Sequence, residues 1–482
     1  MLKKELTLAL NYALNKGFQI HPDAFEFLEN VDVKKLEKII KDIVKEKSRQ
    51  KLFQISQDDL ESYFGIKDDQ SIQCEYKVLF DPSSKITSGE GISGYNSLFA
   101  SRFNKLKRII SDRPESRMIK PIASVKSAQS EDDMYVCGLV TARITERNIT
   151  KLLLEDPSGS FEGIIFDNEL QKNADTLLND QFIMARVGIG KNSGFIIKDL
   201  ISPDIPDQAS NKSESEVFAV FLSDLHIGSK YFMEEEFSEF VSWLSSPDPV
   251  ACKIRFVLIG GDVIDGVGIY PNQDKELVCQ TIEEQLEKMV GLISKIPNHI
   301  KIFIMPGNHD PGRRALPQPA IPKKYNPSLW DKENVIMVGN PSIVSLNGVK
   351  VLMFHGQSID DIVKTTPGLS YDSPTNVMKH LLRARHLSPI YGSQTPIAPE
   401  LEDLMVIDEI PDIFHVGHVH RAQLDMYKGI LLINSGSWQN QTPFQASVGM
   451  TPNPGIALMV NLKTFQVLHQ NYNSKLDNIL QS

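Results

Sequence analysis

The stretch FLSDLHIG, residues 221–228, places Asp224 and His226 directly after an apolar run. Later stretches repeat this pattern of an apolar run ending in polar side chains: VLIGGDVIDG (257–266), FIMPGNHD (303–310), VLMFHG (351–356) and FHVGHVH (414–420). Short apolar runs rich in β-branched and aromatic residues predict strands. Because open α/β sheets gather polar residues at the carboxyl ends of their strands, we expect these ends to meet at one site.

The polar residues at these strand ends have the chemistry of metal ligands. They are carboxylates, imidazoles and an amide: Asp224, His226, Asp262, Asn308, His355, His418 and His420. This mixture suits hard or borderline divalent ions such as Mn²⁺ and Mg²⁺. No cysteine lies near the series, which argues against a structural zinc site. The set is larger than one ion needs, so we expect two divalent ions about 3.5–4 Å apart, a spacing that can hold both oxygens of a phosphoryl transfer.

Each motif alone is weak, because a single histidine after a strand is usually a core or surface residue. Taken in order, D-x-H, GD-x-x-D, GNHD, an isolated His and GH-x-H resemble the calcineurin-like metallophosphoesterases over roughly residues 215–475. The segments 233–246 and 274–296 have the pattern of helices that return the chain between strands. We therefore expect a layered α/β phosphoesterase domain over residues 215–482.

Length and composition limit the number of domains, the cellular environment and the partners that we expect. The 482 residues are enough for two or more domains, and the net charge of −10 gives no overall attraction to nucleic acid, so any DNA contact must be local. The four cysteines lack metal or disulfide spacing, which is typical of a reducing, cytoplasmic environment. No signal peptide or apolar run of membrane-spanning length is evident, so we expect no membrane association.

The N-terminal part favours helices. Residues 1–65 predict a small helical module, with helices in 6–16, 21–31, 32–47 and 57–65. A packing or docking role is more plausible for this module than nucleic-acid binding, because glutamates are interleaved with its lysines. Residues 66–130 predict a linker that carries a basic amphipathic helix, SLFASRFNKLKRII (97–110). That helix is either a phosphate-contacting surface or a solvated helix that packs on its neighbour.

Residues 131–203 change to a strand pattern. They predict five short strands with one helix, ELQKNADTLL (169–178), between the third and fourth. This layout resembles an OB-fold β-barrel. OB-folds often stack single-stranded bases on aromatic rings, but aromatic residues are few here and several stand at core-like positions. We therefore favour a structural or interface role over an autonomous DNA-binding role. Residues 202–216 predict the linker into the last domain.

The order of helical module, linker, OB-fold and phosphoesterase resembles the small (B) subunits of replicative DNA polymerases. RHLSPIYG (385–392), TPIAPE (395–400), PDIFHVGHVH (411–420) and NSGSWQNQTPFQ (434–445) resemble segments of the archaeal family D small subunits, which retain the metal ligands. This resemblance implies a metal-dependent 3′–5′ exonuclease that proofreads the 3′ end of a primer or single-stranded DNA. It also implies a heterodimer with the large catalytic subunit in DNA replication, and contacts with other replisome proteins.

The resemblance also implies a role for each site residue. Asp224, His226 and His420 would hold one ion, Asn308, His355 and His418 the other, and Asp262 would bridge them. His309 would act on the scissile phosphate as a catalytic residue, with Asp310 as the catalytic partner that orients it. Asp265 is expected to be structural, capping the helix or turn after its strand, with the orientation of a metal ligand as the alternative. Two arginine clusters, Arg313 with Arg314 and Arg383 with Arg385, are candidates for binding substrate phosphates, with plain surface charge as an equal alternative.

Two other function classes stay open on sequence grounds. A protein or small-molecule phosphatase would share the metal core, although the preceding OB-fold and helical module speak against it. A non-catalytic scaffold for the large subunit would gain nothing from clustered acids and histidines. No constellation for nucleotide polymerisation stands out, so we expect that the isolated chain cannot extend a primer. Residues 442–462 and the barrel surface are candidates for the large-subunit interface.

Overall fold

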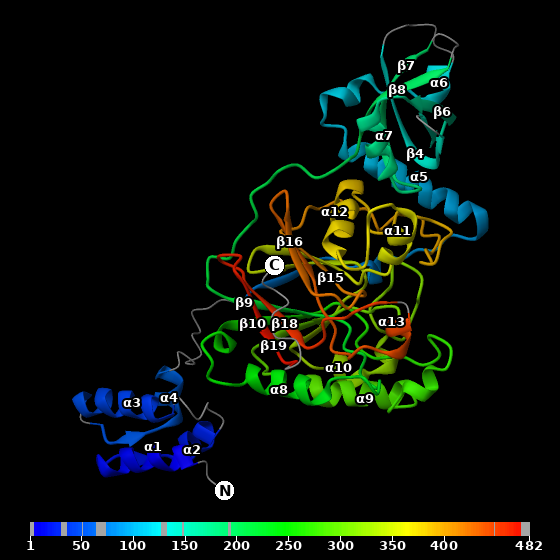
Figure 1. Ribbon diagram of the computed structural model, residues 1–482. Helices are drawn as coiled ribbons and strands as arrows, with labels where there is room; N and C mark the ends of the chain where they lie inside the picture. The colour runs from blue at the N-terminus through cyan, green and yellow to red at the C-terminus, as the bar shows by residue number, and fades with distance from the viewer. Residues whose placement is uncertain are drawn as a thin grey trace.

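The computed structural model describes residues 4–29, 36–50, 52–63, 74–126, 133–146, 149–190, 194–447 and 449–473. Figure 1 shows three compact parts: a helical N-terminal module, a β-barrel and a large layered α/β body. Among the described residues, no helix is both long enough and apolar enough to cross a membrane.

The N-terminal module is helical, as its periodicity predicts. Its helices are α1 (Lys4–Asn15), α2 (Pro22–Glu29), α3 (Leu36–Gln50) and α4 (Gln57–Tyr63). They enclose a small core that includes Phe18, Ile40 and Leu60. Two short strands, β1 (Gln19–Ile20) and β2 (Gln54–Ile55), pair in parallel inside the module. This pairing was not expected, because two-residue strands leave no readable period in a sequence.

The described part of the expected linker, residues 74–126, differs from the prediction. Strand β3 (Tyr76–Phe80) pairs with a strand of the layered body, and α5 (Gly91–Ile109) packs between that body and the barrel. A short helix, α6 (Ile122–Lys126), follows against the barrel. The amphipathic helix predicted at 97–110 is confirmed as part of α5, and Phe103 and Leu106 on its apolar side are buried in a shared core. Strand β3, which precedes it, was not predicted.

The barrel is closed and has five strands, as the sequence predicts. The strands are β4 (Met134–Glu146), β5 (Ile149–Asp156), β6 (Gly159–Ile165), β7 (Phe182–Ile189) and β8 (Phe195–Ile201), joined in the order β4-β5-β6-β8-β7. The predicted helix is α7 (Asn168–Asp175), capped by Asp167, whose carboxylate accepts a hydrogen bond from the Leu170 amide. Phe161 and Phe182 are buried, so these rings serve the core.

The layered body contains two sheets of six strands each. The first has the order β12 (Val335–Met337), β11 (Lys301–Ile304), β10 (Ile254–Ile259), β9 (Phe218–Leu222), β18 (Ile456–Asn461) and β19 (Val467–Asn471). The second has the order β16 (Gln423–Tyr427), β17 (Ile430–Asn434), β15 (Ile413–Val416), β14 (Val349–Phe354), β13 (Ser342–Leu346) and β3. Strand β18 is fully buried inside its sheet, so this part of the candidate subunit interface at 442–462 is a core element instead.

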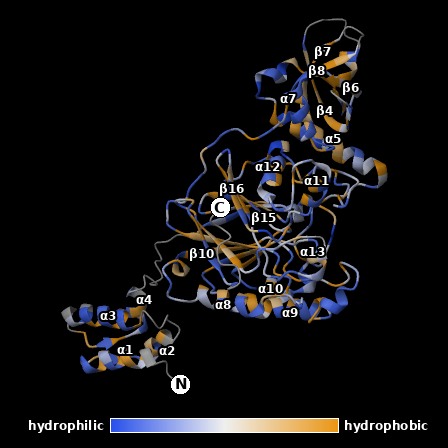
Figure 2. Cartoon of the chain, viewed as in Figure 1, coloured by the Kyte–Doolittle hydropathy of each residue, from blue (hydrophilic) through white to orange (hydrophobic). Residues whose placement is uncertain are grey.

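Helices complete the layers. The two sheets bury a common core, which includes Phe221, Phe303 and Met353. Helices α8 (Glu234–Leu244) and α9 (Ile282–Ile293) cover the outer face of the first sheet, and α11 (Ile359–Thr365) and α12 (Pro374–Ala384) cover that of the second. The remaining helices are α10 (Pro327–Trp330) and α13 (Pro443–Ser447). Figure 2 shows the apolar strands inside this helix–sheet–sheet–helix arrangement.

Parallel pairing decides where the motifs meet. Strands β9, β10 and β11 run parallel in the first sheet, and β14, β15 and β17 run parallel in the second. Their carboxyl ends therefore lie at one edge, where the predicted polar residues follow β9, β10, β11, β14 and β15. The expected layered α/β architecture is confirmed in these two sheets.

Candidate metal centre

The loops after the parallel strands have an unusual backbone. The residues with positive φ include Asp224 (53°), His226 (51°), Asp262 (49°), His418 (70°) and His420 (55°). Non-glycine residues rarely adopt this left-handed conformation, and each instance costs roughly 1–3 kcal/mol. Most of the expected ligands therefore sit on strained backbone that the surrounding fold must hold in place.

Glycines allow these loops to approach closely. A Cβ atom on Gly307 would lie 2.2 Å from Oδ1 of Asp262, and one on Gly417 would lie 2.6 Å from Oδ2 of Asp224. No larger residue fits at either position without moving a carboxylate. The glycines of the GNHD and GH-x-H motifs are thus part of the geometry of the centre.

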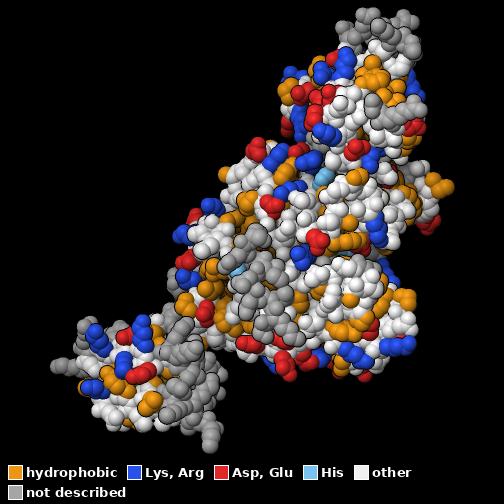
Figure 3. Space-filling model, viewed as in Figure 1, with side chains coloured by type: hydrophobic (Ala, Val, Ile, Leu, Met, Phe, Trp, Pro, Cys, Tyr) orange, Lys and Arg blue, Asp and Glu red, His pale blue; other side chains and the backbone are white. Residues whose placement is uncertain are grey.

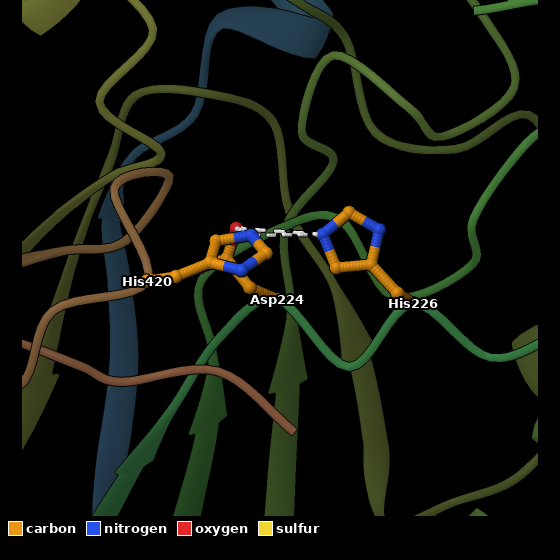
Figure 4. A group of neighbouring side chains, drawn as sticks. All are labelled: Asp224, His226 and His420. Atoms are coloured by element: carbon orange, nitrogen blue, oxygen red, sulfur yellow. Dashed lines mark hydrogen bonds and ion pairs between the residues drawn. The ribbon is translucent and has the colours of Figure 1, made fainter. Parts of the chain in front are cut away.

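One group of donors is formed by Asp224, His226 and His420. Figure 4 shows the two rings and the carboxylate pointing toward one another. The Nε2 atoms of the two histidines are 3.1 Å apart, and Oδ1 of Asp224 lies 3.5 Å from Nε2 of His420 and 4.0 Å from that of His226. That Oδ1 atom is buried and has no hydrogen-bond partner in the described structure.

A second group gathers beside it. Nε2 of His355 lies 3.0 Å from Oδ1 of Asn308 and 3.2 Å from Oδ2 of Asp262. The ring centroids of His355 and His418 are 5.2 Å apart. Oδ2 of Asp262 also lies 4.0 Å from Nε2 of His226, which belongs to the first group. Asp262 therefore stands between the two groups, where a bridging carboxylate would have to be.

Neighbouring acceptors set the tautomers of the histidines. Nδ1 of His226 lies 3.0 Å from Oδ1 of Asp265, and Nδ1 of His355 lies 2.9 Å from the carbonyl oxygen of Gly260. An acceptor at Nδ1 places the ring proton there and leaves the Nε2 lone pair free for an ion. Asp265, expected to be structural, thus orients a candidate ligand.

Two residues that the sequence did not single out contact the other two histidines of the centre. Oδ2 of Asp360, on α11, lies 3.1 Å from Nε2 of His418, which leaves Nδ1 of that ring for an ion. Nε2 of Gln445, on α13, lies 2.9 Å from Nδ1 of His420. Neither residue belongs to a strand-end motif, so only a pairing of distant segments could have indicated them.

His309 lies at the edge of the two groups. Its Nδ1 is 2.8 Å from the carbonyl oxygen of Asp265, so Nδ1 carries the proton and donates it. Its Nε2 lies 3.8 Å from Oδ2 of Asp262. The ring stands edge-on to His226, with a centroid distance of 4.7 Å. Nε2 is therefore the atom that can take or give a proton over the centre.

The expectation that Asp310 orients His309 is wrong. The Asp310 carboxylate instead accepts hydrogen bonds from the backbone amides of Gly307, Val263 and Ile264, at 2.8–3.2 Å. It ties the loop after β11 to the loop after β10. Burial, and then the nearby charge of Asp262, raise the pKa of Asp310 to about 6. Asp310 shapes the centre through the backbone.

The predicted phosphate-binding role of the first arginine cluster is not supported for Arg313. Its Nη1 pairs with Oε1 of the buried Glu400 at 2.6 Å, and its Nε donates to the carbonyl oxygen of Pro317 at 3.0 Å. These bonds hold the loop to another segment and direct most of the guanidinium donors to protein acceptors. Arg314 is exposed and does not line the cavity above the centre.

The second arginine cluster also lies away from the centre. Arg385 is buried at the end of α12 and donates to the carbonyl oxygens of Ile407 (2.8 Å) and Asp408 (3.0 Å). Arg383 lines a different cavity, between the barrel and α12. The sequence showed only that these arginines were near one another, and the fold turns them away from the strand ends.

A cavity of about 600 Å³ opens over the donor groups. Its lining includes His226, Asp262, Asn308, His309, His418 and His420, together with Lys364, Tyr371, Tyr270 and Phe444. Among these described lining residues, Lys364 is the only lysine or arginine. The cavity therefore combines the donor groups with one cation and aromatic walls.

The electrostatics of the centre favour a cation. Burial would raise the pKa of Asp262, but the charges of His355 and His309 hold it well below its usual range. Burial would lower the pKa of His355, yet Asp262 raises it to about 10. In the other group, burial would raise the pKa of Asp224, but the nearby His420 ring holds it low, at about 2. The carboxylates thus stay ionised and attract positive charge.

The residues present fit divalent ions. Two ligands bonded to one ion at ~2.1 Å lie about 3.1–3.4 Å apart, which matches the separation of the His226 and His420 Nε2 atoms. The unpartnered Oδ1 of Asp224 provides the carboxylate oxygen that such an ion needs. For His420 to ligate through Nε2, its Nδ1 must carry the proton, so the Gln445 amide must turn its oxygen toward that nitrogen.

Comparisons with known proteins agree with this architecture. The family model for the B subunits of DNA polymerases alpha and epsilon matches residues 219–424. The DNA polymerase II small subunit of Methanothermobacter thermautotrophicus is 37% identical over 404 residues, covering 82% of this chain and 83% of that protein. The protein of the same name from Thermoplasma acidophilum is 31% identical over 481 residues, covering 99% of this chain and 95% of the relative.

A solved structure described as a novel archaeal phosphodiesterase is also similar, at 10% identity, with 53% of this chain and 99% of that chain covered. Its TM-score of 0.26 is too low to add to the assignment. The family assignment rests on sequence identity over almost the entire length of the chain. The chain belongs to the family of archaeal DNA polymerase II small subunits.

Proposed function

We propose that this chain is a metal-dependent 3′–5′ exodeoxyribonuclease that removes nucleotides from single-stranded DNA. The observation that carries the proposal is the pair of donor groups that share Asp262, with Nε2 of His309 only 3.8 Å from its carboxylate. When bound, two divalent ions, Mn²⁺ or Mg²⁺, would supply the Lewis acidity for attack on a phosphodiester.

The proposed ion-binding residues follow from the two groups. Asp224, His226 and His420 would hold one ion, and Asn308, His355 and His418 the other. Asp262 would contact both.

His309 is the proposed proton-transfer residue. Its Nδ1–H donates to the carbonyl oxygen of Asp265. When the ring is protonated, its Nε2–H can therefore pass to the leaving 3′-oxygen or stabilise charge on the phosphate. Burial lowers the pKa of His309. Lys364, which also lines the cavity, is the cation best placed to contact a substrate phosphate, in place of the arginines expected from sequence.

We further propose that the chain works as a heterodimer with a large catalytic subunit, where it removes misincorporated nucleotides during DNA replication. The names of the relatives, DNA polymerase II small subunit, support a role as one subunit of a polymerase. Figure 3 shows acidic and basic side chains interspersed on the visible face, which fits local rather than global contact with DNA. The isolated chain is not expected to extend a primer.

The domain division proposed from sequence stays a prediction: 1–65 helical module, 66–130 linker, 131–203 OB-fold and 215–482 phosphoesterase domain. We propose a structural or interface role for the barrel. The burial of Phe161 and Phe182 supports this, because rings in the core cannot stack on bases. Contacts of the barrel with the large subunit or other replication proteins would be consistent with the same role.

The polarity of digestion tests this function. Single strands labelled at the 3′ or the 5′ end are incubated with the full chain and Mn²⁺, and p-nitrophenyl phosphate serves as a monoester control. We expect immediate release of the 3′ label and a ladder of shortening 5′-labelled products. His309→Ala should slow release by about 10²–10⁴-fold, the usual contribution of general acid–base catalysis.

Two results would contradict the proposal. Hydrolysis of the monoester without loss of the strand label would indicate a phosphatase. No hydrolysis of any substrate, alone or with the large subunit, would leave the chain as a scaffold.

A further inference from the structure

We propose that Tyr270 and Phe444 form a base-stacking subsite beside the metal centre. It would take a nucleobase at or next to the 3′ end of single-stranded DNA. The inference rests on the proposed function and deepens it, because it names the part of the substrate that is recognised. Both rings line the cavity that holds the donor groups, and they come from segments far apart in the chain.

The two rings are neighbours in the lining of this cavity. Their planes are inclined by 21° and their centroids are 6.4 Å apart. Stacked bases are spaced ~3.4 Å apart, so one base between two rings needs about twice that distance. A base can enter between the two rings when the exposed side chain of Phe444 turns away from Tyr270, and each ring can then stack on one face of the base.

Phe444 is exposed, yet it is firmly placed. Its side chain is 59% accessible, and it lies on α13 next to the buried Gln445. Gln445 contacts His420 at 2.9 Å, and its side-chain and backbone groups exchange hydrogen bonds with Thr442 at 3.0 and 3.2 Å. A single exposed apolar residue needs no explanation, but this ring is anchored through its neighbour to a candidate metal ligand.

Tyr270 is also held in place. Its hydroxyl group bonds to Oε2 of Glu276 at 3.0 Å. The centroid of its ring lies 6.4 Å from that of His309. Because His309 is the residue proposed to act on the scissile phosphate, a base between Tyr270 and Phe444 would belong to a nucleotide adjoining that phosphate.

A base fits this subsite better than a protein side chain does. Aromatic rings stack on every base regardless of sequence, which an exonuclease needs. A partner protein inserted between the rings would fill the same cavity that the substrate must enter. The chemistry of the walls and their place next to the donor groups therefore point to single-stranded DNA.

Kinetics with and without the terminal bases test the subsite on the full chain. One substrate is an ordinary single strand, and the other has abasic residues in its last two positions. Phe444→Ala and Tyr270→Leu should raise KM for the ordinary strand by about 5- to 100-fold, the usual loss when a base-stacking ring is removed. Both variants should act on the abasic strand as the wild type does. Phe444→Trp and Tyr270→Phe keep an aromatic ring, so their KM should stay close to the wild-type value.

Phe166→Ala is the matched control, because Phe166 is a similarly exposed phenylalanine (54%) on the barrel. It should leave KM unchanged on a short strand.

A binding measurement separates this inference from the hydrolytic function. A strand ending in 2-aminopurine is titrated with the His309→Ala chain, and stacking should quench the fluorescence of the base. Adding Phe444→Ala should abolish the quenching.

The subsite is overturned if the wild type degrades ordinary and abasic strands with equal KM. It is also overturned if Phe444→Ala weakens association with the large subunit and leaves KM unchanged. If the wild type degrades neither strand, the proposed nuclease function fails, while quenching still reports on the subsite.

Discussion

Arg102 joins three parts of the molecule, and its removal gives a sharp stability prediction. It lies on α5, where its Nε donates to Oδ2 of Asp403 at 2.8 Å and its Nη1 donates to the carbonyl oxygen of Pro389 at 2.6 Å, both in the layered body. Nη1 also lies 3.4 Å from the carbonyl oxygen of Asp180, next to the barrel. The side chains of Arg102 and Asp403 are each 1% exposed.

The substitution Arg102→Met keeps most of the volume and removes the charge. Asp403 then remains a buried carboxylate whose described donors are the amide of Met405 and Nε2 of His386. Breaking a buried ion pair from one side costs about 3–5 kcal/mol. At roughly 2 °C per kcal/mol for a large cooperative unit, Tm should fall by about 6–10 °C.

The matched control is Arg108→Met on the same helix. Arg108 pairs with Asp408 at 3.0 Å, but its side chain is 68% exposed, so the loss should be only ~0–1 kcal/mol. Thermal unfolding is followed by circular dichroism, and the double variant Arg102→Met/Asp403→Leu should recover part of the loss because no lone charge stays buried. If Arg102→Met lowers Tm no more than Arg108→Met does, the buried ion pair of Arg102 with Asp403 does not have the predicted effect on stability.

Other predictions concern the centre and the pH dependence of stability. Gly307→Ala should abolish metal binding, because a Cβ there would lie 2.2 Å from Oδ1 of Asp262; metal titration by calorimetry checks this, and wild-type affinity would contradict it. Gln445→Leu should weaken metal binding about 10- to 100-fold, because it removes the group that orients His420. Gln445→Glu should keep or strengthen metal binding, because its carboxylate accepts a hydrogen bond from Nδ1–H of His420. Equal metal affinities of the two variants would count against this role. Burial lowers the pKa of His386 to about 4, so stability should fall as pH drops from ~6.5 to 4, by up to ~1.4 kcal/mol per pH unit. His386→Gln should flatten the Tm–pH profile in that window, and an unchanged profile would refute the assignment.

The sign of this pH effect follows from the tautomer of His386. Its Nδ1 accepts a hydrogen bond from the Ser388 amide at 3.0 Å, and its Nε2 lies 3.0 Å from Oδ2 of Asp403. The ring is therefore neutral and donates through Nε2. Protonation at Nδ1 would break the bond from Ser388, so the unfolded chain binds this proton first as pH falls.

The sequence predicts the parts of the site that depend on strand order. Each expected ligand directly follows a β-type run, and parallel sheets bring such ends together, so Asp224 and His355 meet although 131 positions (355 − 224) separate them. The five-stranded barrel with its helix was predictable for a similar reason, since alternation and turn residues such as Asp156 are local signals.

The remaining features depend on contacts that no local pattern contains. Asp310 follows His309 directly in GNHD, but the turn points its carboxylate at backbone amides instead of the ring. Arg385 looked like a free cation because its carbonyl partners lie more than twenty positions away. The same is true of Asp360 and Gln445, which meet their histidines only after α11 and α13 have packed.

We propose that the strand-end residues form a metal centre that cleaves DNA. The most direct test measures bound Mn²⁺ by mass spectrometry and 3′-nucleotide release on the same preparations of wild type and Asp262→Ala, with circular dichroism to check the fold. We expect about two ions per wild-type chain with stepwise 3′ release, and the loss of both in the folded variant. A wild-type chain that binds no Mn²⁺ and releases no nucleotide, alone or with its large subunit, would contradict it.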